Sequence, residues 1–252
     1  MTSLAIGIDI GGTGIKGALV DVEAGELVSE RFKLETPERG RPGEIIAAVA
    51  RIMDQLEVGK IQAPMGITFP AVVKQGRTMS AANVSTQWIG LEAEKLFERT
   101  LDRDIHFVND ADAAGVAEAR YGAAKGIQGL VLLTTLGTGI GSALLYNGVL
   151  IPNSELGHLE VQGKDAERRA SNAARERERL SWERWARRLQ EYYETLERLL
   201  NPDLFIVGGG VSKSAEEFLP LLKLATPILP AALRNNAGII GAAALATDFA
   251  AR

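Results

Sequence analysis

A glycine-rich turn occurs twice in this chain of 252 residues, each time between apolar runs that predict strands. The first turn lies in Asp9–Lys16 and the second in Leu136–Gly141, about half a chain apart. Glycine lets a chain turn where φ is positive, and it lets backbone N–H groups approach an anion with no Cβ in the way. Either turn alone is compatible with an ordinary hairpin. The pair, with Thr13 and Thr138 at matching places, predicts two phosphate-binding hairpins that face one cleft.

The composition is typical of a globular protein, with 46% hydrophobic and 24% charged residues and no apolar run near the ~18 residues of a membrane span. No basic or separate apolar segment precedes the first strand, so we expect no signal peptide, no membrane contact and a cytoplasmic location. The chain has no cysteine, which excludes disulfides, a thiolate nucleophile and a cysteine-based zinc site. A net charge of −4 argues against a general nucleic-acid surface.

Apolar periodicity and turn residues predict the same order of elements in both halves of the chain. In the first half we expect strands at 4–10, 15–20, 27–34, 65–69 and 105–108, with helices at 43–56, 91–99 and 111–121. In the second half we expect strands at 130–136, 142–146, 149–151 and 203–207, with helices at 181–200, 215–224 and 238–251. The tryptophans of helix 181–200 recur at helical spacing, which favours core packing over a stacking role.

This repetition predicts a duplicated α/β fold with two domains flanking a cleft. We expect domain boundaries at 1–109 and 110–237, with the C-terminal helix 238–252 closing the first domain. Ligands often bind at such junctions. The order of elements, with both glycine turns in place, resembles the actin-like (ribonuclease H-like) sugar kinases.

Five short motifs narrow the resemblance: Asp9–Thr13 with Lys16, Asn109-Asp110, Gly137–Gly141, Glu155–His158 and Gly208–Gly210. As a set they resemble the ROK family of sugar kinases and repressors over nearly the full chain. The repressors of that family carry a helix-turn-helix domain ahead of the kinase-like part, and Asp9 lies only nine residues from the first residue given. We therefore expect an enzyme that does not bind DNA.

Zinc-binding ROK proteins carry a cysteine cluster shortly after the Gly-His pair, and this chain has the charged segment Lys164–Arg169 there instead. We therefore expect no zinc. The charged segment is similar to the polyphosphate glucokinase branch of the family. That resemblance implies phosphoryl transfer from inorganic polyphosphate, ATP or both to the 6-hydroxyl of glucose, and in some members of mannose.

Asp110 follows a short apolar strand and precedes a helix, a position at which a carboxylate can stand at the mouth of a cleft. Phosphoryl transfer needs a carboxylate that accepts the proton of the attacking hydroxyl, and Asp110 matches the position of the family's catalytic base. The alternative is a helix N-cap, a position that aspartate favours. Asp112, two residues on, is interpreted as a first-turn charge that the helix dipole favours.

Sugar recognition needs several fixed polar groups, because each hydroxyl requires a partner once water is excluded. The resemblance implies Asn83, Asn109, Glu155 and His158 as sugar-binding residues. It implies one further glutamate, for which Glu160 and Glu167 are the candidates. For His158 a buried structural role is the alternative, and without cysteines a metal role has no obvious partners.

The two hairpins are expected to hold the phosphoryl donor through N–H and hydroxyl groups. The residues implied are Gly11, Gly12, Thr13 and Lys16 for the transferred group, and Gly137, Thr138, Gly139, Gly208, Gly209 and Gly210 for the rest of the donor. Asp9 would repel phosphates unless a cation intervened. We therefore assign it to Mg²⁺, held through water.

A polyphosphate chain would also need a track of cations leading from the cleft. One candidate group is Lys16, Arg31, Lys33, Arg39, Arg41, Lys74 and Arg77, and another is Arg168, Arg169, Arg175, Arg177 and Arg179. Glutamates are interspersed in the second group, which is typical of a solvated helix face. The resemblance implies a homodimer. An ATP-only hexose or amino-sugar kinase and a catalytically silent sugar sensor remain the alternatives.

Overall fold

The computed structural model describes residues 3–58, 61–82 and 84–251, and the chain forms two compact units. Unit 1 comprises Met1–Ala117 with Asn236–Arg252, and unit 2 comprises Glu118–Asn235. The units divide inside helix α3 (Asp110–Tyr121), whereas the expected boundary lies at the start of that helix. The early part of α3 belongs with unit 1 because it packs on the C-terminal helix. A Cβ on Gly241 would come within 1.9 Å of the Ala113 carbonyl oxygen.

A mixed sheet forms the centre of unit 1, in the order β3-β2-β1-β5-β8 with β4 also paired to β2. Strands β1 and β2 form an antiparallel hairpin around the first glycine turn, and β5 and β8 run parallel to β1. The strands are β1 (Leu4–Ile10), β2 (Gly14–Asp21), β3 (Glu26–Leu27), β4 (Phe32–Glu35), β5 (Met65–Phe69) and β8 (His106–Asn109).

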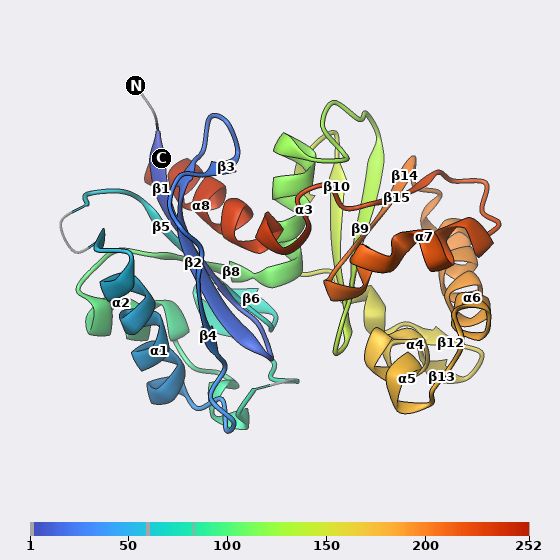
Figure 1. Cartoon of the computed structure of the whole chain (residues 1–252), viewed down its shortest axis with the longest axis horizontal. Helices are drawn as coiled ribbons and strands as arrows, with labels where there is room; N and C mark the ends of the chain where they lie inside the picture. Colours follow the sequence, from blue (N-terminus) through green and yellow to red (C-terminus); the bar gives the residue numbers. More distant parts are fainter. Residues whose placement is uncertain (1–2, 59–60, 83, 252) are drawn as a thin grey trace. The chain divides into compact units, whose positions relative to one another are not determined.

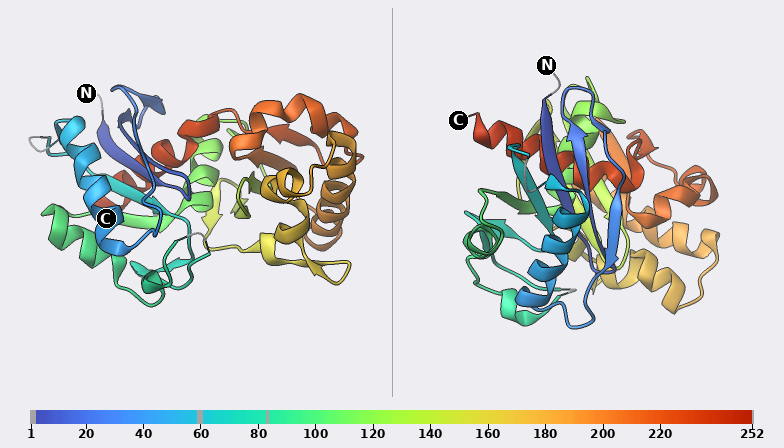
Figure 2. Two further views of the ribbon diagram at one scale, coloured as in Figure 1. Left: turned by 60° about the horizontal axis from the view of Figure 1, so that its bottom comes forward. Right: turned by 60° about the vertical axis from the view of Figure 1, so that its left-hand side comes forward.

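Helices cover both faces of this sheet (Figure 1 and Figure 2). Helices α1 (Pro42–Gln55) and α2 (Ala93–Leu101) lie on one face, and α8 (Ala237–Ala250) lies on the other. Helix α8 is rich in alanine and approaches the strands so closely that Gly7 and Gly66 leave no room for a side chain. A Cβ on either glycine would stand 2.0 Å from a carbonyl oxygen of α8. The smaller elements of unit 1 are β6 (Val73–Lys74), β7 (Arg77–Thr78) and η2 (Thr86–Trp88).

Unit 2 repeats the plan of unit 1, with the strand order β11-β10-β9-β14-β15. Strands β9, β10 and β11 form an antiparallel meander, and β14 and β15 run parallel to β9. The bounds are β9 (Leu130–Leu136), β10 (Ile140–Tyr146), β11 (Val149–Ile151), β14 (Leu204–Gly208) and β15 (Ile228–Pro230). In each unit a hairpin with a glycine turn is followed by parallel strands, so the predicted duplicated α/β fold is confirmed.

The long helix α6 (Trp182–Leu200) packs its apolar face on this sheet, and Trp185 is fully buried in the core, as the periodicity predicted. The other elements of unit 2 are η3 (Leu156–His158), β12 (Glu160–Val161), β13 (Lys164–Asp165), α4 (Ala166–Ala170), α5 (Asn172–Arg177), η4 (Gly210–Ser214), α7 (Ala215–Phe218), η5 (Leu219–Leu221) and η6 (Arg234–Asn236, at the unit boundary). Among the described residues, every helix is too short or too polar to span a bilayer.

Two predicted elements were wrong in extent. The strand expected at 27–34 is interrupted between β3 and β4, because the Ser29 hydroxyl accepts the Leu19 N–H in place of a ladder carbonyl. The helix expected at 215–224 ends as α7 at Phe218 and continues only as the short η5. Pro220 has no N–H to extend the α-helical ladder, which explains the early end.

Candidate active site

The first glycine turn, Gly11–Thr13, joins β1 to β2 in unit 1. The Gly11 N–H donates to the Gly14 carbonyl at 3.0 Å, and the Thr36 hydroxyl donates to the Gly11 carbonyl at 2.6 Å. Gly12 and Thr13 are exposed. The expectation that these glycines supply positive φ was wrong, because none of them adopts it, nor do Gly137 and Gly139. Their contribution is the missing side chain, which leaves open space at Gly137 and makes room for the Glu167 carboxylate at Gly139.

Asp9 and Lys16 face each other across the β1–β2 hairpin. The Lys16 ammonium lies 3.0 Å from Asp9 Oδ2, and the Thr68 hydroxyl at the end of β5 donates to Asp9 Oδ1 at 2.9 Å. Helix α8 begins against this carboxylate, since a Cβ on Gly238 would lie 2.8 Å from Asp9 Cγ. Asp9, predicted to bind the metal, and Lys16, predicted to bind phosphate, therefore form an ion pair with each other beside the turn.

Asn109 and Asp110 lie at the junction of β8 and α3. Asn109 is buried, and its amide is engaged at both ends: Oδ1 accepts the Asp112 N–H at 3.0 Å and Nδ2 donates to the Ala71 carbonyl at 3.0 Å. Asn109 therefore caps α3, a role considered for Asp110. The Asp110 carboxylate accepts its neighbour's N–H, that of Ala111, at 2.9 Å and is only half-buried. Asn83, the other amide expected to bind sugar, lies outside the described residues.

The second glycine turn, in unit 2, is held by a glutamate distant in sequence. The Gly137 N–H donates to the Gly139 carbonyl at 3.0 Å, and the Ile140 N–H donates to Glu167 Oε2 at 2.9 Å. A Cβ on Gly139 would stand 2.2 Å from the same carboxylate oxygen. Glu167, one of the two glutamates considered for sugar, thus supports the turn with one oxygen.

The predicted donor motif Gly208–Gly210 meets the second glycine turn. Gly209 adopts φ +82°, and a Cβ there would lie 2.5 Å from the Leu136 carbonyl oxygen. Only glycine combines this φ with so close an approach to another backbone. Gly210 has open space where a side chain would be. The structure therefore brings together both glycine motifs that were assigned to the donor in this half of the chain.

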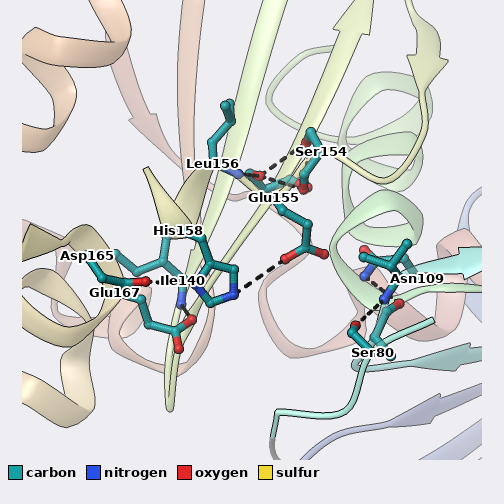
Figure 3. Close-up of polar contacts among 12 residues, drawn as sticks. Ser80, Asn109, Ile140, Ser154, Glu155, Leu156, His158, Asp165 and Glu167 are labelled. Carbon is teal, nitrogen blue, oxygen red and sulfur yellow. Dashed lines mark hydrogen bonds and ion pairs between the residues drawn. The ribbon is translucent and has the colours of Figure 1, made fainter. Parts of the chain in front are cut away.

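Glu155 precedes η3 and His158 is its last residue, and this short helix is fixed to strand β10 (Figure 3). The Leu156 N–H donates to the Ser142 hydroxyl at 2.9 Å, and Gly157 packs on the backbone of Ile140 so tightly that a Cβ would lie 2.0 Å from its carbonyl oxygen. Glu155 Oε2 and His158 Nε2 are 3.9 Å apart and both side chains are exposed. This pair presents a carboxylate and an imidazole to one surface.

The other ring nitrogen of His158 is engaged by Asp165, with Nδ1 and Oδ2 3.0 Å apart. This hydrogen bond, together with the charges of Glu167, Asp165 and Glu155, raises the pKa of His158 against the effect of partial burial. Burial raises the pKa of Glu155, which the His158 charge partly offsets. The cluster therefore holds an imidazole whose orientation is set from behind by Asp165 and whose Nε2 faces Glu155 (Figure 3).

Four supporting residues were missed in the sequence: Thr68, Asp165, Ser142 and Gly238. Asp165 had a local signal, because it stands three residues before Arg168 and accepts that residue's N–H as the N-cap of α4. Thr68 and Ser142 carry no such signal, since their partners lie on other strands or loops.

The sequence of this chain matches a known protein family. Residues 5–172 match the model of the ROK family, and the chain belongs to that family. It is 46% identical to a polyphosphate glucokinase of Mycobacterium tuberculosis over 94% of this chain and 89% of the relative. It is also 46% identical to the polyphosphate glucokinase of Mycobacterium leprae, over 96% of this chain and 74% of the relative.

Solved structures agree with this assignment. The inorganic polyphosphate/ATP-glucomannokinase of Arthrobacter sp. strain KM superposes with a TM-score of 0.93 at 50% identity, covering 99% of each chain. A ROK family glucokinase of Streptomyces griseus, solved in complex with glucose and AMPPNP, gives a TM-score of 0.84 at 26% identity, covering 97% of this chain and 99% of that one. The predicted actin-like sugar kinase fold is confirmed.

Proposed function

We propose that this protein transfers a phosphoryl group from inorganic polyphosphate or ATP to the 6-hydroxyl of glucose. The observation that carries the proposal is the match over 99% of the chain, at 50% identity, to a polyphosphate/ATP-glucomannokinase. The residues described above supply the groups that such a reaction needs: a half-buried carboxylate, two open glycine turns and a carboxylate–imidazole pair.

Asp110 is the proposed general base. Asn109 caps α3, so the cap does not require the Asp110 carboxylate, which stands half-buried at the start of the helix. As the oxygen of the 6-hydroxyl attacks the terminal phosphorus, its proton passes to this carboxylate. The bond to the donor's bridging oxygen breaks, and the shortened polyphosphate or ADP leaves.

The open glycine turns are the proposed donor contacts. Gly11, Gly12 and Thr13, with the Lys16 ammonium, would bind the transferred phosphoryl group through N–H, hydroxyl and charge. In unit 2, Gly137, Thr138 and Gly139 with Gly208, Gly209 and Gly210 would bind the rest of the donor. The support is geometric: Gly137 and Gly210 have no neighbouring atom within 4 Å of the place a Cβ would take, so the backbone there is accessible.

Glu155 and His158 are the proposed sugar contacts, with Asn83, Asn109 and Glu167 completing the set that the family resemblance implies. The Glu155 carboxylate accepts hydroxyl protons and the His158 imidazole offers Nε2, because Nδ1 is already bonded to Asp165. Asn109 has one Nδ2 hydrogen left after its bond to Ala71, which limits it to a single donated contact.

Asp9 suits the expected Mg²⁺ site only if its carboxylate contacts the ion through bound water. Both of its oxygens already accept, from Lys16 and from Thr68, and the described residues contain no group of three or more metal-ligating side chains. A single carboxylate that holds hydrated Mg²⁺ together with donor phosphates suits this arrangement. The ion would supply charge compensation for the donor. Zinc is not part of this proposal.

The decisive assay measures glucose 6-phosphate made from glucose and Mg²⁺ with ATP or with polyphosphate. Asp110→Asn should lower kcat by about 10² to 10⁴-fold with either donor while the protein stays folded. Asp104→Asn, an exposed aspartate in the preceding loop, is the matched control and should leave kcat unchanged. Undiminished turnover by Asp110→Asn would refute the base assignment.

The same assay decides among the alternatives. Product from ATP alone identifies an ATP-only kinase, competition by mannose or amino sugars identifies the sugar range, and sugar binding without product identifies a silent sensor. The homodimer and the cytoplasmic location stay predictions.

A further inference from the structure

Two cations near the first glycine turn, Lys33 and Arg31, have no role in the phosphoryl transfer proposed above. Lys33 on β4 lies directly opposite Lys16 on β2 in the antiparallel register. Like charges placed opposite each other in a β-ladder are destabilising. Lys16 is compensated by Asp9, but within the part of the chain that the structure describes no carboxylate lies within 4.0 Å of the exposed Lys33 ammonium. The charge of Lys33 is therefore the one left uncompensated in this pair, and a bound anion would compensate it.

The Lys33 side chain folds across the strand next to the turn. Its Cε lies 2.8 Å and its Nζ 3.7 Å from the point that a Cβ on Gly14 would occupy. Gly14 is the first residue after the exposed Gly11–Thr13 turn. The missing side chain at Gly14 thus lets the exposed Lys33 side chain pass close to the backbone next to the turn.

Arg31 continues the row just before β4. Its Nη1 donates to Asn236 Oδ1 at 2.8 Å, which fixes the guanidinium but leaves its charge uncompensated, because the partner is neutral. Glu35, opposite Gly14, is the single carboxylate on β4 and makes no ion pair among the described residues. From the turn outward, Lys16, Lys33 and Arg31 therefore form a strip of three cations. Among the described residues Asp9 is the one carboxylate that makes an ion pair with it, and Glu35 stands at the end next to the turn.

We propose that Lys33 and Arg31 bind the phosphates of a linear inorganic polyphosphate that follow the first three, which are the phosphates that polyphosphate and ATP have in common. This rests on the proposed function. ATP presents a nucleoside after its third phosphate and gains nothing from a longer cationic strip, whereas a polyphosphate carries a negative charge on every further unit. The strip contributes to donor binding only: the terminal phosphoryl group still passes to the sugar hydroxyl, and the proton to Asp110.

The test compares three donors, ATP, tripolyphosphate and a long polyphosphate, in steady-state kinetics with the intact protein. Lys33→Gln should raise KM for the long chain about tenfold, the size of one charge-assisted contact, and leave kcat unchanged. Its KM for ATP should stay within about twofold, as for an exposed charge with no partner. Arg31→Gln should act in the same direction, and Lys33→Arg should restore long-chain binding.

Lys95→Gln is the matched control, because it removes one positive charge from an exposed lysine of α2 in the same unit. It should change no KM, which separates a local contact from a general loss of attraction for polyanions. An equal KM increase for ATP and long polyphosphate in Lys33→Gln would overturn the proposal, as would an unchanged long-chain KM. Failure of the proposed function is distinct: the unmodified protein would then make no glucose 6-phosphate from either donor.

Discussion

The close contact between Gly238 and the Asp9 carboxylate can be tested by replacing Gly238 with alanine. Gly238 is the second residue of α8, and replacing it by alanine would put a Cβ 2.8 Å from Asp9 Cγ and 2.8 Å from Oδ1. Carbon atoms in contact sit about 3.5 to 4.0 Å apart, so one partner must move by about 0.7 to 1.2 Å.

Neither helix α8 nor the Asp9 carboxylate can move without losing contacts. Helix α8 lies against the backbone of β1 and β5 through Gly7 and Gly66, and the Asp9 carboxylate is held by Lys16 and Thr68. Close backbone packing fixes the helix, whereas two hydrogen bonds hold the end of one side chain, so we expect the displacement to fall on Asp9. Asp9 is the proposed Mg²⁺ contact, and a shift of about 1 Å in a group that positions the reactants costs on the order of a hundredfold in rate. We therefore expect Gly238→Ala to lower kcat about a hundredfold with both donors.

Stability should behave differently from activity. Alanine is favoured over glycine in a helix by about 1 kcal/mol, which offsets part of the clash, so the free energy of unfolding should change by less than about 1 kcal/mol. Gly43→Ala is the control, at the second position of α1, with no atom within 4 Å of the new Cβ. It should gain stability and keep full kcat. If Gly238→Ala kept kcat within about threefold of the unmodified protein, the reasoning would be refuted.

Two further predictions concern unit 2. Tyr193→Phe leaves the buried Thr134 hydroxyl without its 2.6 Å partner and should lower the free energy of unfolding by about 1 to 2 kcal/mol in urea titration. Tyr192→Phe removes a buried hydroxyl that has no hydrogen bond among the described residues and should not destabilise; equal losses in the two variants would contradict the assignment. Because the His158 pKa is raised above 6.5, its stabilising contribution is complete below that value and lost as pH rises through the folded-state pKa. His158→Gln should therefore cost more stability near about pH 6 than near about pH 9, and a pH-independent cost would count against the Asp165 contact.

The duplicated fold was predictable because its signals are local. Strand β9 and strand β11 match their predicted bounds, since each is a short apolar run closed by turn residues. The pairing of Asp9 with Lys16 was implicit too, because the two residues flank one hairpin at equal distances from its turn. Patterns that extend over a single hairpin are visible in one sequence.

The supporting contacts of the site were not predictable in the same way. Glu167 reaches Ile140 across 27 positions, and Gly238 meets Asp9 from the opposite end of the chain. Both depend on how helices pack on the sheets, which periodicity does not define. The broken strand after β3 and the short α7 have the same origin, because a single side-chain hydrogen bond or one proline decided where the element ended.

The short segment Asp165–Glu167 contacts both a proposed sugar-binding residue and the proposed donor-binding turn of unit 2. Asp165 bonds His158, and Glu167, two residues further, bonds the backbone of the second glycine turn. A movement of this short segment would change the imidazole and the turn together, so with the proposed roles of these groups we expect sugar binding and donor binding to be thermodynamically linked. Linkage is reciprocal: glucose should tighten the donor by the same factor by which the donor tightens glucose. Calorimetric titration of each ligand in the presence and absence of the other, with AMPPNP as donor, measures this factor, and an unchanged affinity for both ligands would exclude the coupling.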